Sequence, residues 1–187
     1  MNTPMNGRPG WRTLPAMTNE PIHLAVRVGH VHLRVVDIDR SLAFYRDALG
    51  FAVVADGRPL GLPAAFLAAG DYHHHIGLNT FEGAGVPPAD PERAGLYHVA
   101  FVYPDRRELA RAIQRLVDHG FPPDHATDHG GTVSVYLDDP DGNGIELYYD
   151  RPRERWFDAD GNPILKADHF DFQEILDHPD NHNNGGS

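Results

Sequence analysis

An internal repeat constrains the fold of this 187-residue chain more than any other feature of its sequence. Residues 29–51 are GHVHLRVVDIDRSLAFYRDALGF, and residues 97–121 are YHVAFVYPDRRELARAIQRLVDHGF. Each stretch runs from a His through alternating apolar residues and an acidic turn into an amphipathic segment that ends at Gly-Phe. When His30 is aligned with His98, the acidic turns also align, and a longer second helix accounts for the later two-residue slip. The matching order predicts a duplicated structural unit.

Each repeat has the periodicities of a strand followed by a helix. In residues 30–36, His30 and His32 fall on one face and the apolar residues on the other, and residues 41–49 carry apolar side chains at helical spacing. Both halves are therefore expected to run strand–helix–three strands, which is an α+β fold. The expected strands are 30–36, 51–55, 64–68 and 73–78 in the first half and 97–103, 132–137 and 145–149 in the second, with helices at 41–49 and 106–119.

The repeat also predicts the domain organisation. Two modules are joined by a Gly/Pro-rich linker, and the two ends of the chain have the polar composition of disordered segments. A C-terminal extension follows the second module and carries a short helical pattern at residues 170–176. The expected divisions are a disordered leader at 1–21, a single domain at 22–150 with module one at 28–81, the linker at 82–95 and module two at 96–150, the extension at 151–176, and a disordered tail at 177–187.

The composition excludes several functional classes. The net charge of −11 argues against a nucleic-acid or anionic-membrane partner, because both require a basic face. The chain has no cysteine, so a bound metal needs His, Asp or Glu ligands. No apolar run approaches the ~20 residues of a membrane-spanning helix. The start of the chain does not resemble a secretory signal, so we expect a cytoplasmic protein.

Two His and one Glu are the candidate metal ligands. If the halves are structural repeats, His30 and His98 open equivalent strands and face each other across a cleft. Glu146 lies in an apolar strand, with Ile145 and Leu147 on the opposite face. Two imidazoles and one carboxylate form the facial triad suited to non-haem Fe(II) or Mn(II), and Zn(II) or Ni(II) also accept these ligands. Each residue alone also has an ordinary explanation, as a surface or hydrogen-bonded His or as a solvent-facing carboxylate.

Other polar residues are candidates for the same cleft. The run His73, His74 and His75 leads into an apolar strand, so at least one imidazole should point inward, where it can relay a proton. The pattern alone does not choose among the three. Tyr136 lies on the strand before the candidate Glu, where its phenol can donate to a bound oxygen, and His129 lies nearby in the chain. Packing in the core is the alternative for an isolated Tyr.

These stretches resemble the vicinal oxygen chelate superfamily, which includes glyoxalases, bleomycin-resistance proteins and extradiol dioxygenases. The resemblance rests on residues 29–51, on LYHVAFVYPD at 96–105 and on YLDDPDGNGIELYYD at 136–150, and it covers residues 28–150. It implies two βαβββ modules that form a cupped mixed sheet around one metal. The superfamily's ligand positions match the two candidate His and the candidate Glu one by one.

Within this superfamily, the sequence is most similar to short catechol-2,3-dioxygenase-like proteins. In the extradiol branch, the second His of the strand that resembles the His run is the acid/base, which gives that role to His74. That branch also has a Tyr ten residues before the ligand Glu, where Tyr136 stands. Its His nine residues before the Tyr falls here on Thr127, between His125 and His129. The resemblance therefore implies an Fe(II)-dependent enzyme that cleaves a catechol-like aromatic diol with dioxygen, using His74, Tyr136 and His129 as catalytic residues.

Two other functions stay open at this stage. A glyoxalase-type isomerase or lyase would use Ni(II) or Zn(II) on the same triad with a fourth ligand, but the corresponding strand offers only His and Asn79. A metal-free binding protein of the bleomycin-resistance type has little need for both His and the Glu in register. The resemblance also implies pairing through the sheets, so we expect a homodimer that acts on a small molecule.

Overall fold

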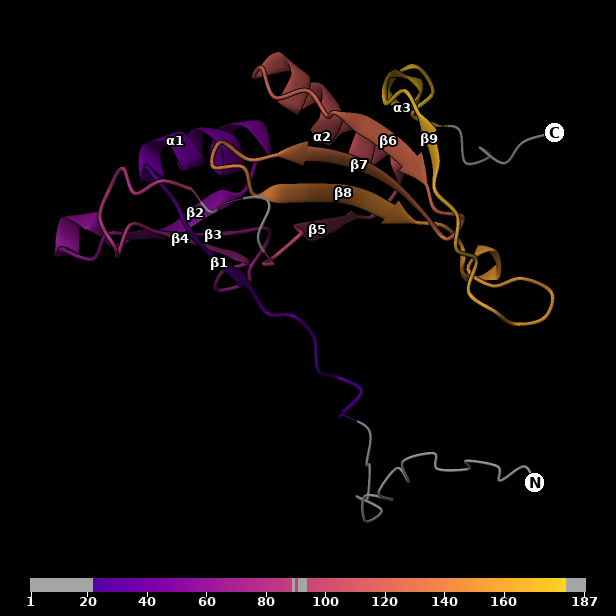
Figure 1. The fold of residues 1–187 in the computed structure, drawn as a ribbon, viewed down its shortest axis with the longest axis horizontal. Helices are drawn as coiled ribbons and strands as arrows, with labels where there is room; N and C mark the ends of the chain where they lie inside the picture. The colour runs from indigo at the N-terminus through magenta and orange to yellow at the C-terminus, as the bar shows by residue number, and fades with distance from the viewer. Residues whose placement is uncertain (1–21, 89, 91–93, 181–187) are drawn as a thin grey trace, which may run out of the picture.

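The computed structural model describes residues 22–88, 90 and 94–180, so the expected leader at 1–21 and residues 181–187 of the expected tail lie outside the described residues. The chain forms two βαβββ modules, each built on a mixed sheet (Figure 1). This architecture confirms the α+β fold predicted from the repeat. Within the described ranges, no helix has the length and apolar character needed to cross a membrane.

Module one carries a four-stranded sheet in the order β1-β4-β3-β2. The edge strand β1 runs parallel to β4, and the other neighbours are antiparallel. The elements are β1 (Val31–Arg34), α1 (Ile38–Leu42), η1 (Ala43–Ala48), β2 (Ala52–Asp56), η2 (Arg58–Leu60), β3 (Ala64–Ala68) and β4 (Ile76–Asn79).

Module two repeats this order in a five-stranded sheet, β5-β8-β7-β6-β9. Its edge strand β5 also runs parallel to its neighbour, β8. The fifth strand, β9, comes from the C-terminal extension and lies beside β6 (Figure 1). The elements are β5 (His98–Tyr103), α2 (Arg106–Asp118), β6 (His125–Asp128), β7 (Thr132–Asp138), β8 (Gly144–Asp150), η3 (Arg153–Arg155), β9 (Asp168–Phe170) and α3 (Gln173–Asp177).

Residues shared by the two repeats begin and end the two helical segments. Asp37 and Asp105 each accept a hydrogen bond from the backbone N–H three residues later, at 2.8 and 2.9 Å, and so cap the first turn. Gly50 and Gly120 follow the helices with φ values of 88° and 83°. This left-handed conformation strains other residue types, so glycine is the natural residue at both ends. The repeat therefore encodes the same local structure twice.

The first helix differs from the α-helix expected at 41–49. The α-helix ends at Leu42, and η1 continues it as a π-helix in which Leu49 N donates to Phe44 O at 2.9 Å. Phe44 and its neighbour Tyr45 are both fully buried. A π-helical turn is wider than an α-helical turn, and its apolar spacing over one or two turns does not distinguish the two.

Three other segments also differ from the sequence-based expectation. Strand β4 begins at Ile76 rather than at residue 73, so the alternating faces expected for the His run do not apply. The short polar strand β6 had no predicted bounds. The extension contains β9 and α3 where one helix was expected at 170–176. Pairing with neighbouring strands, rather than local apolar periodicity, defines these strands.

One apolar core joins the two modules. Phe44 contacts Phe121, and Phe51 contacts Phe101, with ring centroids 5.1 and 5.2 Å apart. Both α1 and α2 lie along the same side of the sheets (Figure 1). The core therefore fills the helix side of the molecule, and the polar side chains of β5 and β8 point to the other sheet face.

The DPDGNG turn between β7 and β8 also ties module two to module one. Asp139 accepts a hydrogen bond from the buried Tyr45 hydroxyl at 2.7 Å. Asp141 accepts one from Val36 N at 3.3 Å. Burial, followed by the Asp139 carboxylate, raises the pKa of Tyr45 well above its usual value, so the phenol stays a donor. These contacts fix the turn that leads into β8, the strand of Glu146.

Candidate metal and substrate site

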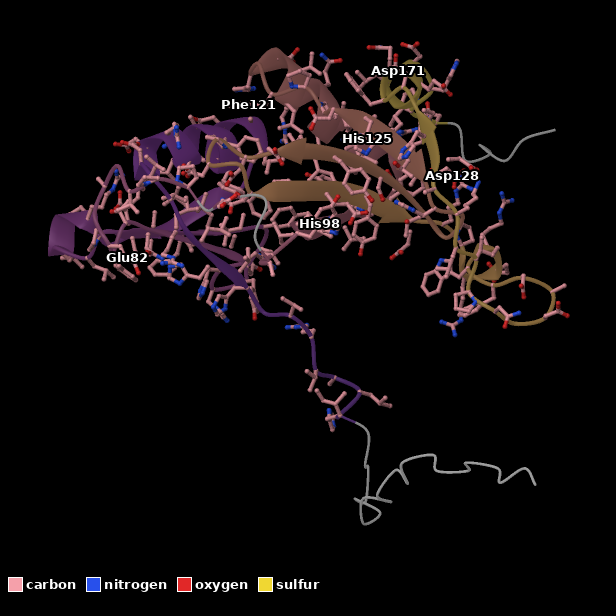
Figure 2. The ribbon with its side chains drawn as sticks, viewed as in Figure 1. Glu82, His98, Phe121, His125, Asp128 and Asp171 are labelled. Carbon is pink, nitrogen blue, oxygen red and sulfur yellow. The ribbon has the colours of Figure 1, made fainter. Side chains whose placement is uncertain are left out.

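His98 and Glu146 lie side by side on the open face of the five-stranded sheet (Figure 2 labels His98). They come from the parallel neighbours β5 and β8, in which His98 pairs with Gly144 and Ala100 pairs with Glu146. Both chain neighbours of Glu146 are buried, so strand alternation turns Glu146 to the opposite, open face. His98 Nε2 is 3.1 Å from Glu146 Oε2, and the two side chains are 32% and 13% exposed.

Glycine at position 144 allows the two strands to begin this close together. A Cβ on Gly144 would lie 2.3 Å from the Tyr97 carbonyl oxygen and 3.1 Å from His98 Cβ. Any side chain at this position would therefore push the start of β5 away from β8. The last Gly of the DPDGNG turn thus helps to place His98 next to Glu146.

The pair has the spacing of two ligands of one metal ion. Nitrogen and oxygen ligands lie about 2.1 Å from such an ion, so two ligand atoms at a right angle are about 3 Å apart. The observed separation of 3.1 Å matches this geometry. In the part of the chain that the structure describes, the buried Nδ1 of His98 also lacks a hydrogen-bond partner. This nitrogen is not the one that faces Glu146, because the 3.1 Å separation is measured from Nε2. The fit to a divalent metal therefore rests on the spacing and on the ligand types, an imidazole nitrogen and a carboxylate oxygen.

His30, the third candidate ligand, lies with module one. Its ring centroid is 4.4 Å from that of His74, and the His74 ring contacts Phe66 at 5.2 Å. Among residues 22–88, 90 and 94–180, no three His, Asp or Glu side chains come together in a way that could hold a metal ion. The structure therefore brings the candidates together as two separate pairs, His30 with His74 and His98 with Glu146.

The His run forms a bend just before β4, with each ring in a different environment. His73 Nδ1 is 2.8 Å from His74 Nδ1, and His75 Nδ1 accepts a hydrogen bond from Ala69 N at 3.3 Å. Burial, followed by the neighbouring imidazoles, lowers the pKa of His74 and favours its neutral form. Of the three rings, His74 is the one that contacts His30.

Tyr136 connects Glu146 to His129. Strand β7 places Tyr136 directly opposite Glu146, and the Tyr136 hydroxyl donates to Glu146 Oε1 at 3.0 Å. His129 Nε2 lies 2.8 Å from the same hydroxyl, while the Lys166 carbonyl accepts a hydrogen bond from His129 Nδ1 at 3.0 Å. A carbonyl only accepts, so the bond to Lys166 uses the Nδ1 proton of His129. Nε2 lies within hydrogen-bond distance of the phenol oxygen, whose single proton points to Glu146.

The Tyr136 phenol stays protonated at neutral pH. Burial, followed by the neighbouring Glu146 carboxylate, raises the pKa of Tyr136 to about 12. A protonated phenol next to a carboxylate is a hydrogen-bond donor. Tyr136 can therefore donate either to Glu146 or to an oxygen atom of a bound ligand.

A cavity of about 390 Å³ opens beside these polar groups. Its volume lies in the range of small-molecule sites. The His125 ring, labelled in Figure 2, stacks on Tyr136 with centroids 5.0 Å apart and an 18° angle between the planes. His169 from β9 stands edge-on to His125 at 5.3 Å. The lining residues are Tyr97, His98, Asp124, His125, Thr127, His129, Tyr136, Leu137, Asp138, Gly144, Ile145 and His169.

Sequence reasoning named His129 as a candidate, but it did not predict that β6 and β9 form one wall of this cavity. His125, Thr127 and His129 alternate along one face of β6 and the residue after it, and this period of two was visible in the sequence. His169 had no such signal. Only the antiparallel pairing of β9 with β6 brings His169 to the cavity.

The sequence matches the family described as the Glyoxalase/Bleomycin resistance protein/Dioxygenase superfamily over residues 27–147. It is 37% identical over 159 residues to catechol-2,3-dioxygenase of Bacillus subtilis (strain 168), a match that covers 83% of this chain and 53% of that protein. It is 34% identical over 124 residues to biphenyl-2,3-diol 1,2-dioxygenase 3 of Rhodococcus globerulus, covering 66% of this chain and 63% of that protein. The chain thus spans less than two thirds of the length of these curated relatives.

The fold is similar to that of a crystal structure of a glyoxalase/dioxygenase from Nostoc punctiforme. The TM-score is 0.56 at 26% sequence identity, and the match covers 67% of this chain and 92% of that chain. The similarity supports the arrangement of the two modules. The family match ends at residue 147, so the extension and its strand β9 lie beyond it.

Proposed function

Because the chain belongs to the glyoxalase/bleomycin resistance protein/dioxygenase superfamily, as its motifs predicted, we propose that it is a metal-dependent extradiol-type dioxygenase that cleaves the ring of a catechol-like diol. The observation that carries the proposal is the His98–Glu146 pair, with Tyr136 bonded to the same carboxylate beside a cavity of about 390 Å³. Relatives named as catechol and biphenyl-diol dioxygenases, at 37% and 34% identity, support an aromatic diol and dioxygen as substrates.

The proposed metal ligands are His30, His98 and Glu146, and the proposed ion is Fe(II). The same ligand types also accept Mn(II), Ni(II) or Zn(II). When bound, the ion would neutralise the charge of the diol and bring the two reactants together. His98 and Glu146 have the spacing for this role, whereas His30 lies on the face of module one. The complete triad therefore requires the face of module one to approach that of module two, from the same chain or from a second copy.

The side chains around this site would handle protons and orient the diol. We assign the proton relay to His74, which contacts His30 and would reach the diol in the same approach. The Tyr136 hydroxyl would donate a hydrogen bond to an oxygen atom of the diol or of dioxygen. The bonded series Lys166 carbonyl, His129 and Tyr136 holds the phenol in one orientation before substrate arrives.

A homodimer is also part of the proposal. The apolar side chains of Val53 and Val54 on β2 and Val102 on β5 are exposed in the single chain, and a second copy would cover such surface. Sedimentation velocity should therefore give twice the mass of one chain. A single species with the mass of one chain would contradict this part of the proposal.

The two alternative functions have less support. A glyoxalase-type enzyme needs a fourth protein ligand or a water in its place. The Asn79 side chain is not free for this role, because its amide donates to Leu33 O at 3.2 Å and its side-chain carbonyl accepts from Phe81 N at 3.2 Å. Asn79 is thus engaged in holding the sheet. A metal-free binding protein has little need for both aligned His residues and the Glu, although the His98–Glu146 contact alone is also an ordinary polar pair.

Oxygen-dependent ring cleavage tests the proposal. The protein is first loaded with Fe(II) in the absence of oxygen. When oxygen and catechol are then added, it should consume about one molecule of dioxygen for each molecule of catechol cleaved. With isotopically labelled dioxygen, the ring-opened product should contain both labelled atoms. Glu146→Gln protein treated in the same way should be inactive. Iron-loaded wild-type protein that leaves every catechol intact would contradict the proposal.

A further inference from the structure

We propose that His169, carried by β9 of the C-terminal extension, binds the part of the diol that lies away from its two hydroxyl groups. This inference rests on the proposed function and adds a substrate contact to it. The matched family region ends at residue 147, so the residue comes from a segment beyond that region. The extension would then be a wall of the substrate site as well as an added strand.

A row of four rings crosses the open face from the candidate metal ligands to β9. The ring centroids are 5.9 Å apart from His98 to Tyr136, 5.0 Å from Tyr136 to His125, and 5.3 Å from His125 to His169. All four residues line the same cavity. If the two hydroxyl groups of the diol lie beside His98, the cavity leaves room along this row for a group attached to its ring, in the direction of His169.

His169 is held so that one ring nitrogen is left for a ligand. Strand pairing places His169 opposite Thr127, and its Nδ1 lies 2.9 Å from Thr127 Oγ1. Thr127 is only 1% exposed, so it is a fixed anchor. With Nδ1 engaged in this bond, Nε2 is the nitrogen of His169 that can hydrogen-bond a molecule in the cavity.

The cavity favours a diol larger than catechol itself. A volume of about 390 Å³ lies in the range of pockets that hold drug-sized ligands. His125 and His169 provide hydrogen-bonding and aromatic surface at the end away from His98. The substrate class that fits is a catechol whose ring carries a further group able to hydrogen-bond with an imidazole.

The extension also reaches the proposed catalytic residues. The Lys166 carbonyl, two residues before β9, accepts the hydrogen bond from His129 Nδ1 at 3.0 Å. A disturbed extension would therefore affect both His129 and His169. A test of His169 needs a substitution that keeps β9 in place.

Binding of two probes to metal-loaded protein without oxygen isolates the role of His169. 4-Nitrocatechol carries a hydrogen-bond acceptor on its ring and changes colour when its hydroxyl groups ionise. Catechol lacks that group, and its binding is measured by displacement of the first probe. His169→Asn keeps a side-chain nitrogen near the position of Nδ1 for Thr127 and removes Nε2. We expect 4-nitrocatechol to bind roughly 3- to 10-fold more weakly and catechol to change by less than about 2-fold.

His178→Asn is the matched control, because His178 is an exposed imidazole directly after α3 that does not line the cavity. Unchanged 4-nitrocatechol affinity in His169→Asn would overturn the inference and leave the proposed function standing. Equal losses for both probes, together with a lower melting temperature, would give His169 a structural role and also overturn the inference. Wild-type protein that binds neither probe would refute the proposed function, and this inference with it.

Discussion

The two modules share one strand order but place different side chains at equivalent positions. When His30 is aligned with His98, the pair His32 and Gly77 of module one corresponds to the pair Ala100 and Glu146 of module two. In module one the His32 imidazole lies directly over Gly77: a Cβ on this glycine would be only 2.8 Å from the His32 ring. In module two the small residue is on β5, and the carboxylate is on β8. The larger residue of the pair is thus on the first strand in module one and on the last strand in module two.

This reversed placement accounts for the different chemistry of the two faces. Module one presents neighbouring imidazoles, among them His30 and His74, whereas module two presents a carboxylate bonded to an imidazole and a phenol. Among the described residues, neither face by itself brings two imidazoles and a carboxylate close enough together to hold one metal ion. The repeat therefore gives both modules the same backbone frame, and the proposed site needs side chains from both.

Glu146→Gln should have the largest effect, because it removes the carboxylate that has no counterpart in module one. We expect metal affinity to fall by roughly 100-fold or more, since a neutral amide is a far weaker ligand. Calorimetric titration with Mn(II) measures this change. Glu154→Gln, at an exposed residue of η3, is the control and should bind as the wild type does. Wild-type affinity in Glu146→Gln would remove the carboxylate from the site.

His30→Ala and His98→Ala test how the two faces combine. Each variant alone should lose most of its metal, because each removes one proposed imidazole ligand. If two copies complete each other's sites, a refolded mixture of the variants should regain about a quarter of the wild-type metal. If the mixture regains no metal, the two imidazoles of each site must come from the same chain. Full metal binding by His30→Ala would show that His30 is not a ligand.

His74→Ala separates proton relay from metal binding on the face of module one. We expect kcat to fall by roughly 100-fold with little change in metal content, because general acid–base catalysis contributes about this much. Steady-state kinetics and elemental analysis of the same samples check both quantities. His73→Ala, which changes the neighbouring exposed ring, should keep most of the activity. Equal kinetic losses in the two variants would argue against a specific relay at His74.

Tyr136→Phe should give the smallest effect and tests the electrostatics of the module two face. The pKa of Tyr136 is raised from 10.0 to about 12 in the folded chain. The stabilisation of the folded state that results from this shift is fully present below pH 10, the pKa of the Tyr in the unfolded chain, and is lost as the pH rises toward 12. The difference in unfolding free energy between wild type and Tyr136→Phe should therefore narrow between about pH 9 and about pH 11.5. A constant difference in urea unfolding would contradict the raised pKa.

Local patterns predicted the parts of the site that depend on one strand or one repeat. Alternation placed Glu146 on the face opposite its apolar neighbours, and the repeat singled out His98; the structure has these two side chains 3.1 Å apart. The repeat also aligned the two acidic turns, and the structure shows that Asp37 and Asp105 of these turns cap the helices that follow. The roles of His98 and Glu146 as metal ligands remain predictions.

The remaining parts depend on contacts between distant segments. The bend before β4 sets the direction of His74, and it has no periodicity that a sequence pattern would detect. The position of His169 depends on the pairing of β9 with β6, in which His169 lies opposite Thr127, 42 residues earlier in the sequence. Likewise, the distance between the faces of His30 and His98 depends on how the two modules pack, which neither repeat encodes by itself.

Metal content is the most direct test of the claim that the face of module two supplies two of the three metal ligands, His98 and Glu146. Protein purified without chelator should contain about one Fe or Mn ion per chain by elemental analysis. His98→Ala should lose this ion, and His119→Ala, which changes an exposed imidazole on the far end of α2, should keep it. A wild-type protein without metal, or the same metal content in His98→Ala, would contradict the account.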